Sequence, residues 1–222
     1  GIKVGDRVYG FAAWGALADE MIVDGSACFV LPDGVDNEVG AAYGNGYATS
    51  LYALRDRGKL QPGETLLVHG AAGGVGLAAV DLGRTMGARV IATARNAERL
   101  QICKQQGADH LVDYSDGFRE EVKALTEGRG ADVIYDPVGG DVFDESMRCI
   151  APFGRILVVG FTAGRPALAK TNHLLVKDAE VIGFTLGGLN RLDPARARNC
   201  LDDLVRWLAA GRITPYYSHE LP

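Results

Sequence analysis

The stretch His69-Gly70-Ala71-Ala72-Gly73-Gly74-Val75-Gly76 decides the fold of this chain. It closes the apolar run 65–69, which is typical of a strand buried in a parallel sheet, and it opens a segment with apolar residues at helical spacing over 74–86. Small residues at 71, 73 and 76 allow a tight turn, close approach of the backbone to a phosphate, and close packing of helix on strand. The order of strand, glycine-rich turn and helix predicts a dinucleotide-binding unit, with the pyrophosphate at the start of the helix.

Strands and helices alternate after this motif, with short turns marked by glycine or proline. The pattern predicts further strands at 89–93, 110–114, 132–136, 155–161 and 180–185, and helices at 96–106, 118–128, 141–150 and 194–210. Strict alternation of this kind predicts an α/β fold with a doubly wound parallel sheet, the Rossmann arrangement. Because this fold serves many functions, the function has to come from particular residues.

The residues before the motif have a different character. The first 32 residues favour strands, at 4–10 and 17–23, and Leu31-Pro32-Asp33-Gly34 predicts a turn. Residues 38–57 have helical spacing, which Gly44-Asn45-Gly46 interrupts. His69 ends a buried strand, so we expect it to be a hydrogen-bonded core residue and not a catalyst.

Composition limits the classes of function. The net charge of −5 argues against nucleic acid as a main partner, because binding to its backbone requires a basic surface. No apolar run approaches the roughly 20 residues of a membrane-spanning helix, so we expect no membrane partner. The four cysteines lie far apart without the spacing of metal ligands; we expect no metal site, and small buried thiols in a reducing compartment, the cytoplasm.

The end of the second predicted strand distinguishes two dinucleotides. An NAD site places Asp or Glu there, where the carboxylate binds the ribose 2′-hydroxyl. Here Ala92-Thr93-Ala94 is followed by Arg95 and, one helical turn later, by Arg99. A guanidinium pairs with a phosphate through two N–H groups, which favours the 2′-phosphate of NADPH. The alternative is that both arginines are solvated surface charges.

Seven blocks together make the chain resemble the medium-chain dehydrogenase/reductase superfamily, in particular its zinc-independent NADPH:quinone oxidoreductase branch. The blocks are Val4-Gly5-Asp6-Arg7-Val8, Leu31-Pro32-Asp33-Gly34, Leu60-Gln61-Pro62-Gly63-Glu64, Ala71-Ala72-Gly73-Gly74-Val75-Gly76, Gly107-Ala108-Asp109-His110, Asp136-Pro137-Val138-Gly139-Gly140 and Gly154-Arg155-Ile156-Leu157-Val158-Val159-Gly160.

This resemblance implies a division of the chain into three parts. Residues 1–45 would be part of a GroES-like, β-rich catalytic domain, residues 46–212 the NADPH-binding domain, and residues 213–222 the start of the return into the catalytic domain. We therefore expect the chain to be a fragment of a longer enzyme, inactive by itself. Zinc-dependent relatives carry a cysteine ligand at the position of Asn45, so the resemblance implies a zinc-free site.

The resemblance also extends the set of candidate site residues. It implies that the nicotinamide lies near Asn45, Thr49, Val138, Gly139, Gly160 and Phe161. It also implies that Tyr114 and Arg99 lie by the 2′-phosphate, and that Asp81, where relatives commonly have glutamine, lies on the outer side of its helix. The predicted cofactor-binding residues are Ala72, Gly73, Gly74, Val75, Gly76, Thr93, Arg95, Arg99, Tyr114, Val138, Gly139, Gly160 and Phe161.

The function implied is hydride transfer from NADPH to a small electrophile, either a quinone or a related conjugated enone. Two alternatives stay open, namely an enoyl-thioester or alkenal reductase of the same superfamily, and a crystallin-like NADPH-binding protein without turnover. No proton donor is assigned; Tyr43, Tyr47 and Thr49 are nearby in sequence. We also expect a homodimer that joins the cofactor domains along the strand at 180–185.

Overall fold

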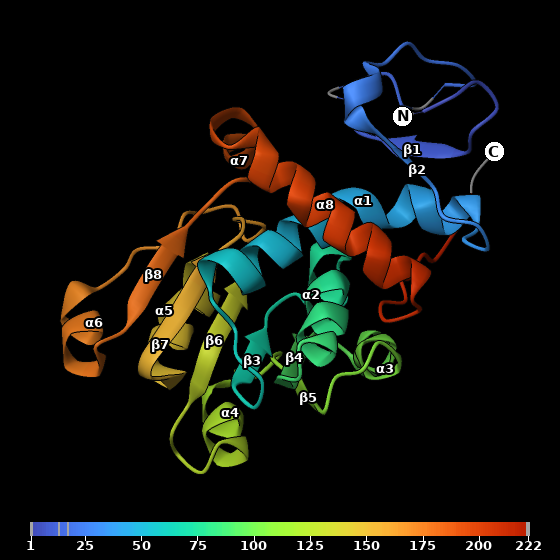
Figure 1. The fold of residues 1–222 in the computed structure, drawn as a ribbon. Coiled ribbons are helices and arrows are strands. Elements are labelled where there is room, and N and C mark those ends of the chain that lie inside the picture. The colour runs from blue at the N-terminus through green and yellow to red at the C-terminus, as the bar shows by residue number, and fades with distance from the viewer. Residues whose placement is uncertain (1, 13, 17, 221–222) are drawn as a thin grey trace.

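A six-stranded parallel sheet forms the centre of the molecule in the computed structural model, which describes residues 2–12, 14–16 and 18–220 (Figure 1). Its strand order is β5-β4-β3-β6-β7-β8. The chain therefore builds the sheet outward in opposite directions from the central strands β3 and β6, which divide it into two halves. The predicted α/β fold with a doubly wound parallel sheet is therefore confirmed. The strands are β3 (Thr65–Val68), β4 (Arg89–Ala94), β5 (His110–Asp113), β6 (Ala131–Asp136), β7 (Ile150–Val158) and β8 (Glu180–Gly183).

Helices cover both faces of this sheet. One hydrophobic cluster packs one face against α1, α2, α3 and α8, and a second cluster packs the other face against α4 and α5. The helices are α1 (Asn37–Leu51), α2 (Gly74–Thr85), α3 (Ala97–Gln105), α4 (Arg119–Leu125), α5 (Gly140–Cys149), α6 (Thr171–Lys177), α7 (Leu186–Leu192) and α8 (Pro194–Ala209). The short helices α6 and α7 were not predicted.

A two-stranded antiparallel sheet, β1 (Val8–Gly10) with β2 (Cys28–Val30), lies apart from the large sheet and next to the end of the described chain (Figure 1). The predicted strand at 4–10 is thus too long, since Val4 and Gly5 form a turn. The strand at 17–23 is wrong over its described residues 18–23, which are irregular; Leu17 lies outside the described residues, as do Gly1 and Pro222 at the predicted domain ends. The turn after Leu31 is confirmed.

The helix α1 runs without a break through Gly44-Asn45-Gly46, where an interruption was predicted, and crosses the predicted domain boundary at 45/46. It continues into a π-helical segment, η2 (Tyr52–Arg57). The missing side chains at 44 and 46 make room for neighbours: a Cβ at Gly44 would lie 3.1 Å from the ring of Phe11, and one at Gly46 would lie 3.4 Å from the carbonyl oxygen of Gly74. Tertiary packing therefore outweighs the low helix propensity of glycine here.

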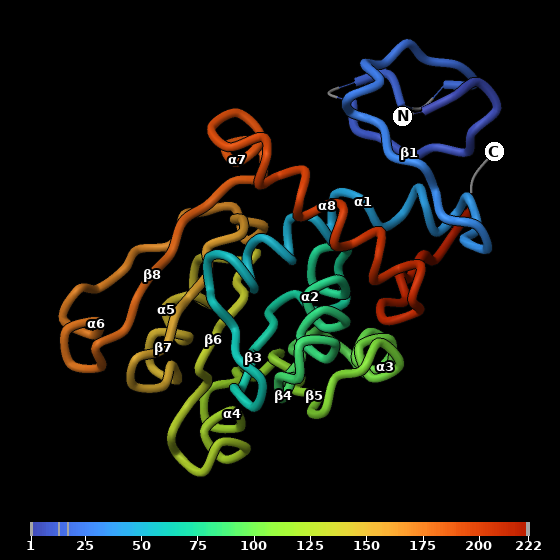
Figure 2. The backbone as a smooth tube through the Cα atoms, viewed as in Figure 1, coloured from blue at the N-terminus to red at the C-terminus, as the bar shows by residue number. Residues whose placement is uncertain are grey.

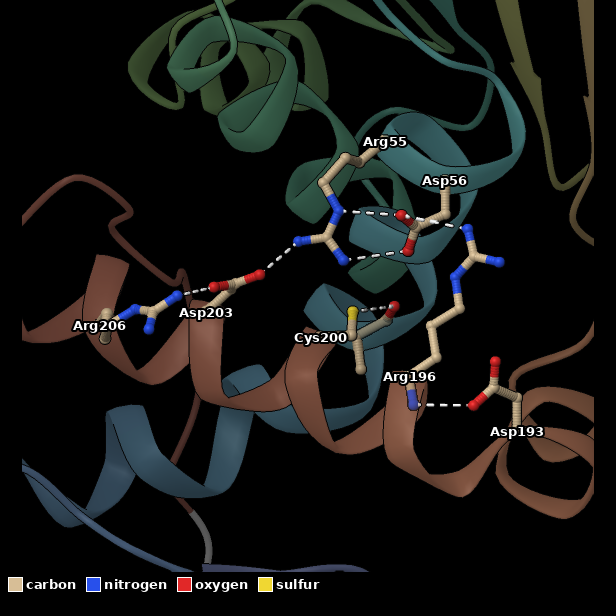
Figure 3. Close-up of polar contacts among 8 residues, drawn as sticks. Arg55, Asp56, Asp193, Arg196, Cys200, Asp203 and Arg206 are labelled. Carbon is tan, nitrogen blue, oxygen red and sulfur yellow. Dashed lines mark hydrogen bonds and ion pairs between the residues drawn. The ribbon is translucent and has the colours of Figure 1, made fainter.

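Ion pairs fasten α8 to η2 (Figure 3). The Arg55 guanidinium donates to Asp56 of η2 at 3.0 Å and to Asp203 of α8 at 2.6 Å, and Arg196 of α8 lies 3.6 Å from Asp56. Nearby, the Cys200 thiol donates to the carbonyl of Ala48 at 3.9 Å. Each exposed ion pair contributes little to stability. A shared network of partly buried pairs, however, fixes how α8 lies across α1 and its continuation η2.

All four cysteines are buried free thiols, as predicted. His69 is a core residue, also as predicted: its Nδ1 lies 3.0 Å from the Thr93 hydroxyl and its Nε2 lies 2.8 Å from the Ser146 hydroxyl. The imidazole thereby joins β3, β4 and α5. Complete burial lowers the pKa of His69 to about 3, so the ring is neutral in the folded chain at neutral pH.

The first turn of α2 packs closely on the loop after β3, at Gly76. A Cβ at this position would lie 2.3 Å from the carbonyl oxygen of Gly70 and 2.7 Å from the Cα atom of Ala71. Both neighbours are backbone atoms, which cannot move aside as a flexible side chain would. A Cβ at Gly74, two residues earlier, would meet open space.

We predict that Gly76→Ala destabilises the chain by about 3 kcal/mol, because the added methyl group forces the first turn of α2 away from the backbone of Gly70 and Ala71. Gly74→Ala is the matched control, and we expect it to change the free energy of unfolding by less than about 1 kcal/mol. Urea denaturation of both variants measures the difference. Equal effects of the two substitutions would contradict the packing argument.

We predict that His69 makes the free energy of unfolding fall with decreasing pH below about 6.5, its ordinary pKa. Between there and about 3 the unfolded chain binds a proton that the folded chain does not, which costs up to about 1.4 kcal/mol per pH unit. Denaturation at pH 6 and pH 4 should show a shallower pH dependence for His69→Asn than for wild type. The exposed His219→Asn is the control, and a slope that His69→Asn leaves unchanged would refute the prediction.

Candidate dinucleotide-binding site

A cavity of about 430 Å³ lies at the carboxyl ends of β3, β4 and β6, where the two halves of the sheet diverge. Open α/β sheets bind ligands at this point, because the loops on either side turn away from each other there. The cavity brings together residues that are far apart in sequence. Its lining consists of Gly70, Ala72, Gly73, Gly74, Val75, Ala94, Arg95, Arg99, Tyr114, Pro137, Val138, Thr162 and Ala163.

The glycine loop forms the base of this cavity. Gly70 takes a left-handed conformation with φ of 54°, and its carbonyl accepts a hydrogen bond from the N–H of Gly73 at 2.9 Å. Gly73 and Gly74 are exposed, and Gly74 is the first residue of α2. The first N–H groups of a helix have no partner within it, and they carry the positive end of the helix dipole. The loop therefore presents backbone donors to an anion.

The arginines Arg95 and Arg99 form one end of the cavity, together with Tyr114. The guanidinium carbon of Arg95 lies 5.4 Å from the ring centre of Tyr114, within range of a cation–π interaction. The Asn96 side chain accepts from the N–H of Arg99 at 3.1 Å and so caps α3, which places Arg99 in the first helical turn. Among the described residues, no carboxylate forms an ion pair with either arginine.

The buried carboxylate of Asp136 shapes the opposite wall. Its Oδ1 accepts from the N–H groups of Val138 at 2.8 Å and Gly139 at 2.9 Å. Burial raises the pKa of Asp136, and the two N–H groups act against this rise. Thr162 and Ala163 donate from their backbones to the carbonyls of Pro137 and Val138, at 3.1 and 3.0 Å. The loops after β6 and β7 thus form one connected wall.

Besides Thr93, four predicted residues do not line the cavity, namely Gly139, Gly160 and Phe161 in the loops after β6 and β7, and Gly76 on α2. A Cβ at Gly139 would lie 3.2 Å from the ring of Phe161, and one at Gly160 would lie 3.2 Å from the carbonyl oxygen of Pro137. Gly76 is buried beneath the glycine loop, packed against the backbone of Gly70 and Ala71. These positions permit the close packing of the loops.

The structure does not place Thr93 where the sequence suggested. Its side chain is fully buried, and its hydroxyl is paired with His69 in the core. Its carbonyl accepts from the N–H of Ala71 at 3.0 Å, which ties the end of β4 to the glycine loop. The neighbouring Ala94 lines the cavity in its place.

Asn45 and Thr49 lie on α1, across the start of α2 from this cavity. Asn45 is exposed and lines two further cavities, one of about 380 Å³ with Tyr9 and Phe11, and one of about 210 Å³ with Gly74 and Val75. Thr49 is half-buried and lines none of these cavities. Asn45 therefore borders the glycine loop from the other side.

Several lining residues were not among the predicted set, namely Gly70, Ala94, Pro137, Thr162 and Ala163. The sequence signal for Pro137 was present, because Asp136-Pro137 directly follows a buried strand. Thr162 and Ala163 follow β7 in an irregular segment, and only the fold brings them to the cavity.

No group of three or more His, Cys, Asp or Glu side chains in the described part of the chain could hold a metal ion. No described helix has both the length and the apolar character needed to cross a membrane.

Comparisons with known proteins agree with this geometry. A family model described as zinc-binding dehydrogenase matches residues 74–208. A quinone oxidoreductase-like protein 2 homolog of Nematostella vectensis is 38% identical over 98% of this chain, which spans 60% of that protein's length. The quinone oxidoreductase of Escherichia coli, solved in complex with NADPH, is 29% identical with a TM-score of 0.87, over 98% of this chain and 67% of that one.

The structure of CurK enoyl reductase is also similar, with 25% identity and a TM-score of 0.78 over 88% of this chain and 58% of that one. The strand order, the position of the glycine loop at the end of β3 and the matched family model all indicate the same family. The chain belongs to the zinc-binding dehydrogenase family, and within the medium-chain dehydrogenase/reductase superfamily it belongs to the quinone oxidoreductase branch.

Proposed function

We propose that this chain is the cofactor-binding part of an NADPH-dependent oxidoreductase that passes hydride to quinones or related conjugated electrophiles without zinc. The chain spans about three fifths of the length of the curated relatives it matches, so the activity belongs to the longer protein. The observation that carries the proposal is the pair of guanidinium groups at the end of β4, where an NAD site would have a carboxylate.

The residues present fit a dinucleotide phosphate. The glycine loop offers backbone N–H groups for the pyrophosphate, and Gly76 lets α2 lie close enough for them to reach it. Arg95 and Arg99 are free to hold a 2′-phosphate, while Tyr114 holds the Arg95 guanidinium over its ring. The E. coli quinone oxidoreductase, which has the same fold, was solved with NADPH bound.

When bound, NADPH supplies the hydride, and the protein supplies position and a water-poor pocket. The wall held by Asp136 keeps the loop 137–139 fixed beside the cofactor. We propose that Asn45 and Thr49 approach the nicotinamide end from α1. Asn45 also stands where zinc-dependent relatives have a cysteine ligand, which supports a reaction with substrates that are already electrophilic.

A second candidate reaction is reduction of an enoyl thioester, and the similarity to CurK enoyl reductase favours it. Assaying the full-length protein under NADPH with 1,2-naphthoquinone and with crotonyl-CoA separates the two reactions. NADPH binding without oxidation by either compound would favour the third reading, a binding protein without turnover.

We predict that Arg95→Ala raises the Kd for NADPH about tenfold to a hundredfold and leaves the Kd for NADH within about twofold. A charge-assisted hydrogen bond to phosphate contributes about 1.5–3 kcal/mol to binding. NADH has no 2′-phosphate and makes no such bond, so the substitution does not weaken its binding. Fluorescence titration with both dinucleotides measures this. Arg89→Ala, on the exposed start of β4 away from the cavity, is the matched control. If wild type binds both dinucleotides equally, the 2′-phosphate argument fails.

We further propose that two copies pair along β8. This strand is an edge of the sheet, since β7 is its only partner among the described strands. Large apolar side chains lie exposed beside it, among them Leu175 and Val176 of α6 and Leu192 of α7. An edge strand with free backbone groups and apolar flanks is suited to pairing with a second sheet.

We predict that the double substitution Leu175→Lys and Val176→Lys converts a dimer into a monomer, because it places like charges on the proposed contact. Light scattering after size exclusion reports the mass. Ile22→Lys, at an equally exposed apolar residue far from β8, is the control and should leave the mass unchanged. A double variant that stays dimeric at the same concentration would overturn this interface.

A further inference from the structure

The buried carboxylate of Asp81 on α2 accepts hydrogen bonds from three different parts of the chain. Its Oδ2 accepts from the Tyr47 hydroxyl of α1 and from the N–H of Thr214, both at 2.7 Å. Its Oδ1 accepts from the Arg84 guanidinium at 2.7 Å. The side chain is fully buried, whereas the sequence placed it on the outer side of its helix. Only a carboxylate accepts from all three donors at once, because an amide would turn an N–H toward one of them.

Two polar contacts fix α1 on α2, and Asp81 makes one of them. At the start of α2, the Ser50 hydroxyl donates to the carbonyl of Val75 at 3.0 Å and pairs with the Tyr135 hydroxyl at 2.8 Å. The Tyr47–Asp81 contact lies further along α2. Burial raises the pKa of Tyr47, so its hydroxyl keeps the proton that it donates. Two contacts along α1 oppose both sliding and rotation of this helix. They also fix the position of Asn45, which lies two residues before Tyr47 on the same helix.

The segment after α8 depends on the same carboxylate. The Thr85 hydroxyl donates to the carbonyl of Arg212 at 2.9 Å, and the Gln106 amide donates to the carbonyl of Thr214 at 2.6 Å. Beyond these contacts the chain leaves α2 and runs toward the small sheet (Figure 2). On its way Tyr216 lines the cavity of about 210 Å³ that Asn45 and Gly74 also line. Asp81 therefore contacts a segment on each side of this cavity.

We propose that Asp81 is a positioning residue for hydride transfer, which holds α1 through Tyr47 and the returning chain through Thr214 at the nicotinamide end of the site. This proposal rests on the function proposed above. It assigns the two ends of the cofactor to different residues: Arg95 and Arg99 bind the phosphate end, and Asp81 sets the geometry of the other end. A loss at Asp81 then affects turnover more than cofactor affinity.

Two variants, each lacking one hydrogen-bond donor to the Asp81 carboxylate, test this proposal. Tyr47→Phe removes the hydroxyl that holds α1. Arg84→Ala removes the ion pair on the solvent side and one hydrogen bond to the carbonyl of Arg212, a carbonyl that the Thr85 hydroxyl still holds, and it touches no part of α1. Each variant is titrated with NADPH, and hydrogen exchange of residues 43–50 is measured with and without NADPH. The kcat of the full-length protein is measured with 1,2-naphthoquinone.

We expect Tyr47→Phe to keep the Kd for NADPH within about twofold, to reduce the NADPH-dependent protection of 43–50 about fivefold, and to lower kcat about tenfold, because small misplacements cost large factors in rate. Arg84→Ala should leave protection and kcat within about twofold of wild type. Asp81→Asn keeps an oxygen for Tyr47 and Thr214, so it should restore most of the kcat that Asp81→Ala loses.

A purely structural role would lower stability and cofactor affinity together, with equal effects of Tyr47→Phe and Arg84→Ala. That result, or unchanged protection and kcat in Tyr47→Phe, would overturn the proposal. If Asp81→Ala does not fold, the comparison of Tyr47→Phe with Arg84→Ala still decides the question. Wild type that binds no NADPH would remove the proposed function itself, and this inference with it.

Discussion

The close approach of the first turn of α2 to the loop after β3, at Gly76, is the constraint on which the rest of the molecule depends. Any side chain there would overlap the backbone of Gly70 and Ala71, so the helix can begin at this height above the sheet only with glycine. The N–H groups of the first turn then come to the carboxyl edge of the sheet, where the chain continues from β3 toward β4 and from β6 toward β7, in opposite directions along the sheet. The cavity exists because both conditions are met at the same place.

Contacts between backbones do not by themselves fix the orientation of the loops around the cavity, and buried polar groups next to these loops do so. His69 joins β3 to β4 and α5 beneath the loop, through Thr93 and Ser146. Asp136 fixes the facing loop by accepting two backbone N–H groups. Each group is buried and paired, so a displaced loop would leave a polar atom without a partner in the core.

The sequence was sufficient for the sheet, because each strand and helix there is specified by its own neighbours. The alternation of apolar runs with Gly73, Gly87 and Gly107 predicted the fold and the place of the phosphate loop. It failed where distant segments decide the outcome. Asp81 is charged, and charged residues are usually exposed. In the folded chain it is buried, because residues 212–214, more than a hundred positions later, cover it. Thr93 lies at a strand end, where a pattern of small residues does not show which face is buried.

The same reasoning explains why the two ends of the candidate site differ in how they could be found. The phosphate end is built from consecutive residues and from Arg95 just beyond a strand, so local pattern suffices. The proposed nicotinamide end is built from α1, the start of α2 and the chain after α8, which meet only in the folded molecule. In the proposed site, binding energy comes mainly from the first end and geometry from the second, and a fully buried carboxylate is suited to the second task, because it holds three donors in fixed directions.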